Sequence, residues 1–347
     1  MKAIFLTEPE QLRLKEIPEP VLDRPTDVLL ETQAVGICGS DIHYFKHGRI
    51  GDQIIQYPWI VGHECTAIVA DAGTAVNTLR PGDAVVIDPL VACGRCDQCL
   101  SGRRHTCRHQ RFLGCPGQLQ GCLSEYLVMP AECCFPLSKK IPVADAVLAE
   151  PLSIGVYTIE LLQSLRDAPN HLALLGCGPI GLCVMTAARA AGIDAIYATE
   201  KLDYRLAAAM RLGARWTGNV EKTNVVADLL AQKPEGLEAV IDCCGDQQAF
   251  DQAIQLLKPG GLFLIVGIPA SDRVSFDISL LRRKEITIQN VRRQNDCVEK
   301  AIALIESGEM PTGVLVTHEF ELAEAQEAFE IVANYRDGVI KAVIRLD

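Results

Sequence analysis

Short hydrophobic runs, broken by prolines and glycines, characterise the first 150 residues. Segments 27–32, 66–70 and 84–88 alternate or cluster β-branched and apolar residues, and turns such as Pro81-Gly82 separate them. Alternation with a period of two is typical of strands with one buried face, and the prolines and glycines mark the loops between strands. The pattern predicts a mainly β domain over residues 1–150 with several long loops.

A more regular pattern begins near residue 171. Continuous apolar runs recur at 171–175, 195–199, 239–242 and 262–266. The segments between them, such as 179–191, have the length and apolar spacing of helices. Buried strands that alternate with helices are typical of a parallel sheet covered on both faces. The sequence therefore predicts an α/β protein with a doubly wound parallel sheet in a second domain that begins after residue 150; the family resemblance given below places its end at 284 (residues 151–284).

Composition narrows the class of protein. The 347 residues are 49% hydrophobic and 22% charged, with a net charge of −11, which is typical of globular proteins and leaves no basic excess for nucleic acid. No apolar run reaches the ~20 residues of a membrane span, and Glu8 and Glu10 make the start unlike a secretory signal. Fifteen cysteines in such a chain favour a reducing, cytoplasmic setting. We expect most of them to pack as small apolar residues, as at Cys133, Cys134, Cys183 and Cys297.

Four other cysteines form the clearest chemical motif. Cys93, Cys96 and Cys99 make two overlapping C-x-x-C units, and Cys107 follows after one short loop. Four soft sulfur donors on a tight turn suit tetrahedral Zn²⁺, while an iron–sulfur cluster or free thiols are the alternatives. Four protein ligands leave no position for a substrate, so we predict a structural zinc in a lobe at about 93–107.

A glycine-rich turn follows the predicted strand 171–175. Gly176, Gly178 and Gly181 form the G-x-G-x-x-G pattern, which allows a tight turn and close approach of the backbone to a pyrophosphate at a helix N-terminus. Glu200 ends the next strand, where a carboxylate accepts hydrogen bonds from both ribose hydroxyls and repels a 2′-phosphate. The sequence thus predicts NAD in preference to NADP. The predicted cofactor site also includes Pro179, Ile180, Lys201, Arg205 and Val266, with helix surface charge as the alternative for Lys201 and Arg205.

Longer strings of residues connect the chain with a known family. They are Cys38-Gly-Ser-Asp-Ile-His-Tyr44, His47-Gly-Arg-Ile-Gly51 and Glu150-Pro-Leu-Ser-Ile-Gly155. With the four-cysteine lobe and the glycine-rich turn in the expected order, the chain resembles the zinc-containing medium-chain alcohol dehydrogenases over nearly its whole length, and within them the sorbitol and xylitol dehydrogenases. The resemblance implies a GroES-like catalytic domain, made of residues 1–150 and a C-terminal return over 285–347, and a Rossmann domain between them.

The resemblance also implies a second, catalytic zinc. Cys38 and His63 would bind it directly, and Glu64 and Glu150 would complete the coordination directly or through a water. Three protein ligands and one open position are what a catalytic zinc needs. Asp41 would accept a hydrogen bond from the far nitrogen of His63. The resemblance therefore implies two Zn²⁺ per chain.

A proton path and an assembly follow from the same resemblance. Ser40 would hydrogen-bond the reacting hydroxyl, and His43, an imidazole that titrates near neutrality, would pass the proton to solvent; an ordinary surface histidine is the alternative. Relatives form dimers or tetramers, and we expect a homo-oligomer, with a tetramer favoured.

The substrate region departs from the polyol pattern. The loop 112–121 matches the family segment poorly, and Arg293 stands where polyol enzymes tend to have an aromatic residue. The residues that resemble substrate-lining positions are Tyr44, Phe112, Arg292 and Arg293. Zinc, proton path and NAD therefore follow the family, whereas the alcohol is left open.

The function we expect is NAD-dependent oxidation of a secondary alcohol of a polyol, cyclitol or sugar to the ketone. The alternative is another hydroxylated metabolite, such as a threonine-like amino alcohol or a sugar at its anomeric carbon. A non-catalytic protein that binds NAD and zinc, or a zinc-free reductase of the same fold, would not need Cys38, Ser40, His43 and His63 together.

Overall fold

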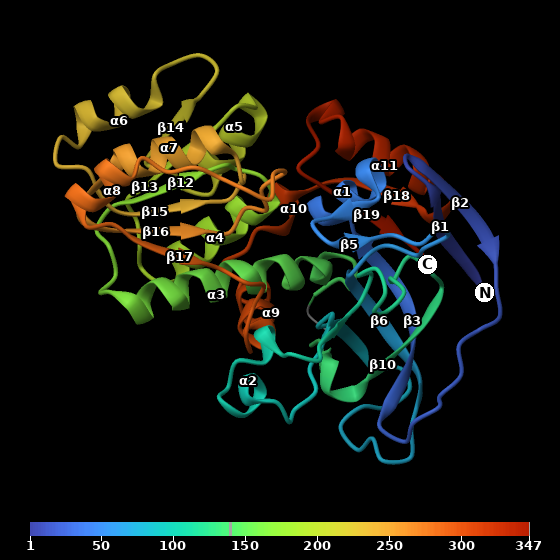
Figure 1. The fold of residues 1–347 in the computed structure, drawn as a ribbon. Coiled ribbons are helices and arrows are strands. Elements are labelled where there is room, and N and C mark those ends of the chain that lie inside the picture. The colour runs from blue at the N-terminus through green and yellow to red at the C-terminus, as the bar shows by residue number, and fades with distance from the viewer. Residues whose placement is uncertain (139–140, 347) are drawn as a thin grey trace. The chain divides into compact units, whose positions relative to one another are not determined.

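A computed structural model describes residues 1–138 and 141–346 (Figure 1). The chain forms two compact units, Met1–Glu150 with Val298–Asp347, and Pro151–Cys297. The second unit extends past the expected boundary at 284, because β17 (Thr287–Asn290) pairs in parallel with β16 (Leu257–Ile265) and continues its sheet. The C-terminal return therefore begins at Val298 and not at residue 285.

The first unit is built on a seven-stranded sheet. Its order is β11-β7-β6-β3-β19-β18, with β10 also paired to β3. β19, from the C-terminal return, pairs antiparallel with the end of β3, so that Val343 lies opposite Gly36. The strands of this unit are β1 (Lys2–Glu8), β2 (Gln11–Glu16), β3 (Asp27–Gly36), β4 (Arg49–Ile50), β5 (Gln53–Ile54), β6 (Glu64–Ala72), β7 (Ala84–Ile87), β8 (Leu90–Val91), β9 (Arg111–Phe112), β10 (Tyr126–Pro130), β11 (Cys134–Pro136), β18 (Val316–Glu321) and β19 (Lys341–Arg345). Its helices are α1 (Gly39–His47), α2 (Asp97–Leu100), α9 (Val298–Glu306), α10 (Thr312–Leu315) and α11 (Ala325–Ala333).

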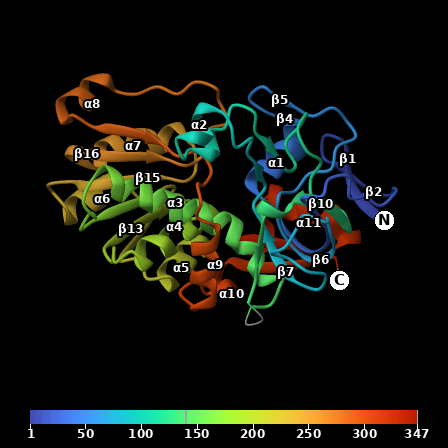
Figure 2. The same ribbon diagram turned by 90° about the horizontal axis from the view of Figure 1, so that it is seen from below.

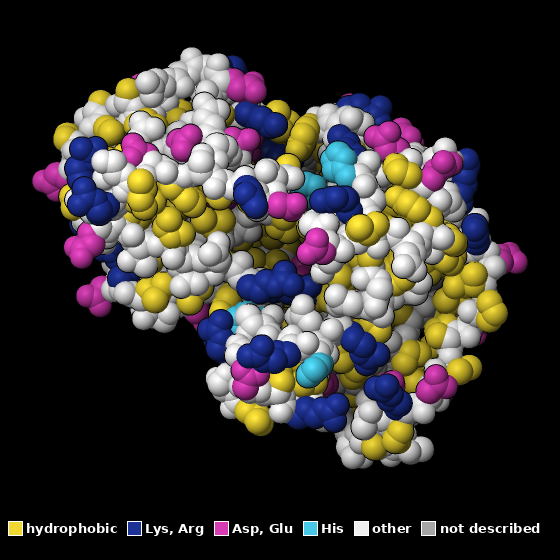
Figure 3. Space-filling model, in the orientation of Figure 1, with side chains coloured by type: hydrophobic (Ala, Val, Ile, Leu, Met, Phe, Trp, Pro, Cys, Tyr) yellow, Lys and Arg dark blue, Asp and Glu magenta, His cyan; other side chains and the backbone are white. Residues whose placement is uncertain are grey.

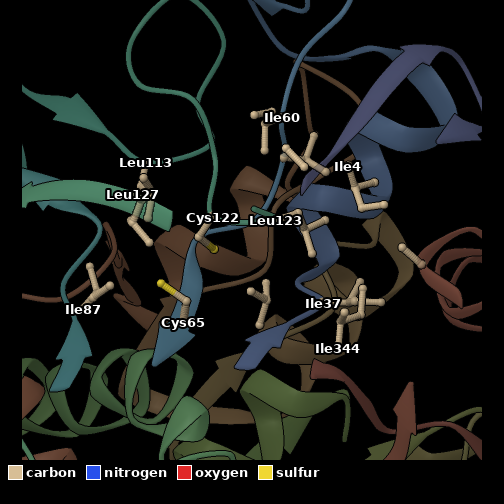
Figure 4. Packing of buried hydrophobic residues seen from close by; sticks show 14 of the residues in the cluster. Ile4, Ile37, Ile60, Cys65, Ile87, Leu113, Cys122, Leu123, Leu127 and Ile344 are labelled. Atoms are coloured by element: carbon tan, nitrogen blue, oxygen red, sulfur yellow. The ribbon is translucent and has the colours of Figure 1, made fainter. Parts of the chain in front are cut away.

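One hydrophobic core supports this sheet. Apolar side chains from the N-terminal strands, the middle of the domain and the C-terminal return pack together, and Figure 4 shows Ile4, Ile37, Leu123 and Ile344 among them. Cys65 and Cys122 belong to the same core. The four cysteines predicted to be apolar core residues are buried as well, namely Cys133, Cys134, Cys183 and Cys297. Cysteine in this chain therefore serves two purposes, as a core residue and as a clustered thiol.

The second unit contains a six-stranded, wholly parallel sheet. Its order is β14-β13-β12-β15-β16-β17, which is the 3-2-1-4-5-6 order of dinucleotide-binding sheets. Right-handed crossovers place α4 and α5 on one face and α7 and α8 on the other (Figure 2). The remaining strands are β12 (Leu172–Leu175), β13 (Ile196–Glu200), β14 (Trp216–Asn219) and β15 (Leu237–Asp242), and the helices are α3 (Ala149–Leu165), α4 (Pro179–Ala190), α5 (Asp203–Arg211), α6 (Val225–Gln232), α7 (Gln247–Leu256) and α8 (Ile278–Lys284). The predicted fold class, a mainly β domain and a doubly wound sheet, is confirmed.

None of the helices that the structure describes combines the length and apolar character needed to cross a membrane.

Candidate functional site

The four lobe cysteines converge on one point. The Sγ–Sγ distances are 4.0 Å for Cys93–Cys99, 3.6 Å for Cys96–Cys99 and 3.9 Å for Cys96–Cys107. A tetrahedron of 2.3 Å Zn–S bonds has edges of about 3.8 Å. Backbone N–H groups of Cys93 and His109 donate to the Cys107 sulfur at 3.2 and 3.4 Å. The thiols are thus arranged with the spacing of a closed tetrahedral zinc site.

The charge around this lobe suits clustered thiolates. Backbone N–H groups of Cys99 and Arg108 lower the pKa of Cys96 to about 6, whereas burial raises the pKa of Cys99 to about 12. Residues 93–111 include five arginines and a single acid, and dark blue side chains gather over the α2 lobe in Figure 3. Four thiolates around one Zn²⁺ carry a formal charge of 2−, which these cations offset.

A second group of metal-ligand atoms lies in the main body of the first unit. One ligand atom each from Cys38, His63 and Glu64 lie within 4.8 Å of one another. Cys38 caps the N-terminus of α1, and Glu64 begins β6, the neighbour of β3. Sulfur, imidazole nitrogen and carboxylate oxygen form a donor set that suits Zn²⁺. The structure therefore brings together three of the four residues expected at a catalytic zinc.

Asp41 holds the two ligand-bearing loops together. It is 1% exposed, and its carboxylate accepts from the backbone N–H of Cys38 at 3.0 Å and of Gly62 at 3.1 Å. Its Oδ1 also lies 3.5 Å from His63 Nδ1. Although burial alone disfavours the charged ring, Asp41 and Cys38 raise the pKa of His63 well above its usual value. The Nδ1 contact leaves Nε2 as the metal-binding nitrogen.

Lys341 is a member of this site that sequence reasoning missed. Its Nζ donates to Glu64 Oε1 at 2.8 Å, to Glu64 Oε2 at 2.6 Å and to the Ile37 carbonyl at 3.0 Å. Both side chains are 1% exposed. A Cβ on Gly36 would lie 2.3 Å from Glu64 Oε2, so the absence of a side chain there makes room for the carboxylate. Glu64 is thus committed to a buried ion pair as well as facing the ligand cluster.

Glu150 occupies a less direct position. It is the second residue of α3 and is 5% exposed, and burial raises its pKa to about 7 in the metal-free protein. His63 and Glu64 are among the charges that act on it, yet it is outside the group of three whose ligand atoms lie within 4.8 Å. Glu150 is therefore buried and feels the charges of the ligand cluster without being one of its three members.

Ser40 and His43 lie on α1, three residues apart, and so share one helix face. Both are half-buried. Burial, and then the nearby His47, lower the pKa of His43 below its usual value. An imidazole that is neutral at pH 7 can accept a proton. The arrangement is therefore suited to a path from the helix N-terminus towards solvent.

The residues expected to line the substrate lie in different environments. Phe112 packs its ring 5.5 Å from the ring of His63. Tyr44 is 5% exposed in the hydrophobic core, and its hydroxyl donates to Gln53 Oε1 at 3.0 Å. Arg292 is exposed and Arg293 half-buried with a left-handed backbone (φ 54°), and both follow β17 in the second unit. Phe112 thus lies beside one of the candidate zinc ligands.

The glycine-rich turn of the second unit has the expected shape. Gly176 follows β12 with φ +96°, Gly178 caps α4, and Pro179 and Ile180 open that helix. A Cβ on Gly181 would lie 2.0 Å from the Gly176 carbonyl oxygen, so only glycine fits there. The turn therefore exposes the N-terminal N–H groups of α4 at the carboxyl edge of the sheet.

Glu200 lies beside this turn. It ends β13, is 8% exposed, and accepts from the backbone N–H of Cys177 at 3.0 Å and of Lys201 at 2.8 Å. Arg205 is 3.9 Å from its carboxylate, whereas Lys201 is exposed. The Val266 N–H donates to the Asp242 carbonyl at the end of the adjoining strands. The predicted cofactor residues thus share the carboxyl edge of the parallel sheet.

Comparison with known proteins identifies the family. The chain matches the alcohol dehydrogenase GroES-like domain over residues 24–139 and the zinc-binding dehydrogenase domain over residues 179–307. Sorbitol dehydrogenase of Bacillus subtilis (strain 168) is 30% identical over 345 residues, which cover 99% of this chain and 97% of the relative. The chain belongs to the zinc-containing medium-chain alcohol dehydrogenases. This dehydrogenase is therefore an oxidoreductase that acts on CH–OH groups.

Two further relatives bear on its specificity. L-threonine 3-dehydrogenase of Bacillus velezensis is 33% identical over 346 residues, covering 98% of both chains. The crystal structure of an oxidoreductase of unknown specificity from Escherichia coli superimposes with a TM-score of 0.92 at 29% identity, covering 100% of this chain and 99% of the other. Overall similarity thus places the dehydrogenase in the family without selecting its alcohol.

Proposed function

We propose that this dehydrogenase oxidises a secondary alcohol of a polyol, cyclitol or sugar to the ketone, with transfer of hydride to NAD. The observation that carries the proposal is the Cys38, His63 and Glu64 cluster, held by the buried Asp41. The reaction releases one hydride to the nicotinamide and one proton to solvent. The full-length similarity to a sorbitol dehydrogenase supports the polyol class of substrate.

The residues have separate tasks in this proposal. Cys38 and His63 hold the catalytic zinc, with Glu64 and Glu150 completing the coordination, and Cys93, Cys96, Cys99 and Cys107 hold the structural zinc. When bound, a catalytic zinc lowers the pKa of a coordinated hydroxyl, from about 15.7 towards about 7 for water. Ser40 hydrogen-bonds the reacting oxygen and His43 delivers the proton to solvent. The Gly176–Gly181 turn and Glu200 bind NAD.

A substrate panel tests the proposal. Sorbitol, xylitol, inositol, an aldose and L-threonine are each supplied with NAD, and reduced nicotinamide is followed by absorbance. Oxidation of a polyol or cyclitol supports the proposed function, whereas oxidation of L-threonine alone would move the protein to the amino-alcohol class, to which the L-threonine 3-dehydrogenase of Bacillus velezensis belongs.

We also propose that the protein acts as a cytoplasmic homo-oligomer, with a tetramer favoured. Sedimentation measures the number of chains in the assembly.

Two zinc ions per chain are expected after purification without chelator. Cys96→Ala should remove one, because a tetrahedral structural site needs all four thiolates. Elemental analysis per chain is the measurement. Cys133→Ala, which changes a buried core cysteine, is the control and should leave the count at two. A count of one in the unaltered protein contradicts the two-site proposal.

Glu200→Ala should erode the preference for NAD over NADP by about 10- to 100-fold, the value of one hydrogen bond to a charged group. The ratio of kcat/KM for the two cofactors is the measurement. Arg211→Gln, at the exposed C-terminal end of α5, is the control and should keep the ratio. An unchanged ratio in Glu200→Ala would place the discrimination at another residue.

His43→Gln should lower kcat for alcohol oxidation by about a hundredfold, the lower end for a lost proton-transfer group. The pKa of His43 is lowered by burial and by His47, and the ring accepts a proton only above its pKa. The rate should therefore hold as pH falls through 6.5 and decline only below it. His47→Gln removes a charge that lowers this pKa, so the acid limb of the kcat profile should move to higher pH. If the acid limb of the kcat profile stays at the same pH in both variants, His43 is not the residue that passes the proton to solvent.

A further inference from the structure

A buried carboxyl group outside the catalytic cluster occupies the centre of the parallel sheet edge. Asp242 is the last residue of β15 and is 0% exposed. β15 pairs with β12, which leads into the glycine-rich turn, and with β16 on its other side. Neither the zinc sites nor the residues proposed for proton transfer use this side chain.

Asp242 ties together the loops that follow β15 and β16. Its carboxylate accepts from the Gly245 N–H at 3.0 Å and the Cys244 N–H at 3.2 Å, and the Cys244 thiol donates to it at 3.1 Å. Its backbone carbonyl accepts from the N–H of Val266 at 2.9 Å and of Gly267 at 3.1 Å. One residue therefore holds both loops through its side chain and its backbone.

The two loops also touch each other closely. A Cβ on Gly267 would lie 2.2 Å from the Gly245 nitrogen and 2.6 Å from Asp242 Oδ2. Gly245 itself has a left-handed φ of +69°. No side chain larger than hydrogen fits at Gly267 without moving the second loop away from the first. Their spacing is thus set by the carboxylate and by this contact.

Burying a carboxyl group at this position disfavours its charged form. Burial raises the pKa of Asp242, and the N–H and thiol donors oppose the rise without cancelling it. A buried polar group is tolerated when its hydrogen bonds are made. The hydrogen bonds of the Asp242 carboxylate hold the loop that follows β15 in place. This loop lies at the carboxyl edge of the sheet, where ligands of such sheets bind.

The sheet order divides a dinucleotide between its two sides. In a 3-2-1-4-5-6 sheet, two similar halves each take one mononucleotide, and the crevice lies where the order reverses, between β12 and β15. Glu200, at the end of β13, lies on the side of the adenosine ribose. The other half of the cofactor then falls over the loops after β15 and β16.

We infer that Asp242 is a positioning residue for the nicotinamide half of the cofactor, acting through the loops 243–245 and 266–268. The inference rests on the proposed NAD-dependent function. Without the carboxylate acceptor the first loop loses the hydrogen bonds of Cys244 and Gly245. The second loop packs directly against Gly245 and shifts with it, whereas the adenosine half, held on the other side of the sheet, is unaffected.

The test compares the binding of the whole cofactor, NADH, with the binding of ADP, which represents its adenosine half. In Asp242→Asn, which places an amide N–H₂ against N–H donors, the Kd for NADH by fluorescence should rise about tenfold or more. The Kd for ADP by calorimetry should stay within about twofold. Glu200→Ala should weaken both ligands. Gly267→Ala, which moves the loops without changing the carboxylate, should reproduce the selective loss of NADH affinity.

Asp246→Asn is the matched control. Asp246 is exposed and caps α7 by accepting from the Gln248 N–H at 2.8 Å, just beyond the first loop, so both Kd values should remain. Equal losses of ADP and NADH in Asp242→Asn and Gly267→Ala would reduce Asp242 to a folding role and overturn the inference, as would unchanged NADH affinity. An unaltered protein that binds neither ligand overturns the proposed function along with the inference.

Discussion

Lys341→Met should destabilise the metal-free protein by about 3–5 kcal/mol, the cost of leaving one member of a buried ion pair without its partner. The Glu64 carboxyl group would lose its ion-pair partner in a place that water does not reach, since both side chains are 1% exposed. Urea unfolding in excess chelator measures the effect. With a slope of about 3 kcal/mol per M, the midpoint should fall by about 1–2 M.

The double variant Lys341→Met with Glu64→Gln separates the missing charge partner from lost packing. Replacing both members of a buried pair is often close to neutral, so most of the midpoint should return. If Lys341→Met alone unfolds at the midpoint of the unaltered protein, the Glu64 carboxylate is not charged in the fold. If the double variant is as unstable as the single one, packing of the lysine stem is responsible.

The fold could be read from the sequence where periodicity and turns agree. The apolar runs at 171–175 and 195–199 overlap β12 and β13 to within one residue at each end. The agreement is close because fully buried parallel strands appear in the sequence as uninterrupted apolar runs. The boundary at 284 could not be placed, since β17 is an edge strand of four residues, none of them fully buried, and has no long apolar run to distinguish it from a loop. Only its register with β16 assigns it to the second unit.

The candidate site residues also differ in how far the sequence could predict them. The spacing of Cys93, Cys96 and Cys99 alone predicts a metal site. Cys38 and His63 are 25 positions apart, and only the family resemblance pairs them as ligands. Lys341 carried one weak signal, a lysine at the start of β19 that interrupts the apolar run 339–344. Its partner, Glu64, lies 277 positions earlier. Sequence periodicity cannot reveal such a contact, because it depends on strands β19 and β6 both flanking β3.

Cys38→Ser should lower kcat/KM for alcohol oxidation by about a thousandfold or more while leaving NADH affinity unchanged. A bound zinc lowers the pKa of coordinated water by roughly nine units, and the loss of three units of this effect for the alcohol would slow the reaction about a thousandfold. The glycine-rich turn proposed to bind NAD belongs to the other unit, so its residues are unchanged in this variant. Steady-state rates, NADH fluorescence and zinc content are measured on the same preparation.

Cys96→Ala gives the comparison that assigns the chemistry, because each variant should lose one zinc ion. If catalysis depends on the Cys38 and His63 cluster, the folded Cys96→Ala protein keeps its kcat near that of the unaltered enzyme, and Cys38→Ser does not. The reverse result would assign catalysis to the four-cysteine lobe, against the tetrahedral closure of its sulfur atoms. Near-normal turnover in Cys38→Ser would remove the zinc mechanism from this site, because a serine hydroxyl is a poor replacement for a thiolate ligand to Zn²⁺.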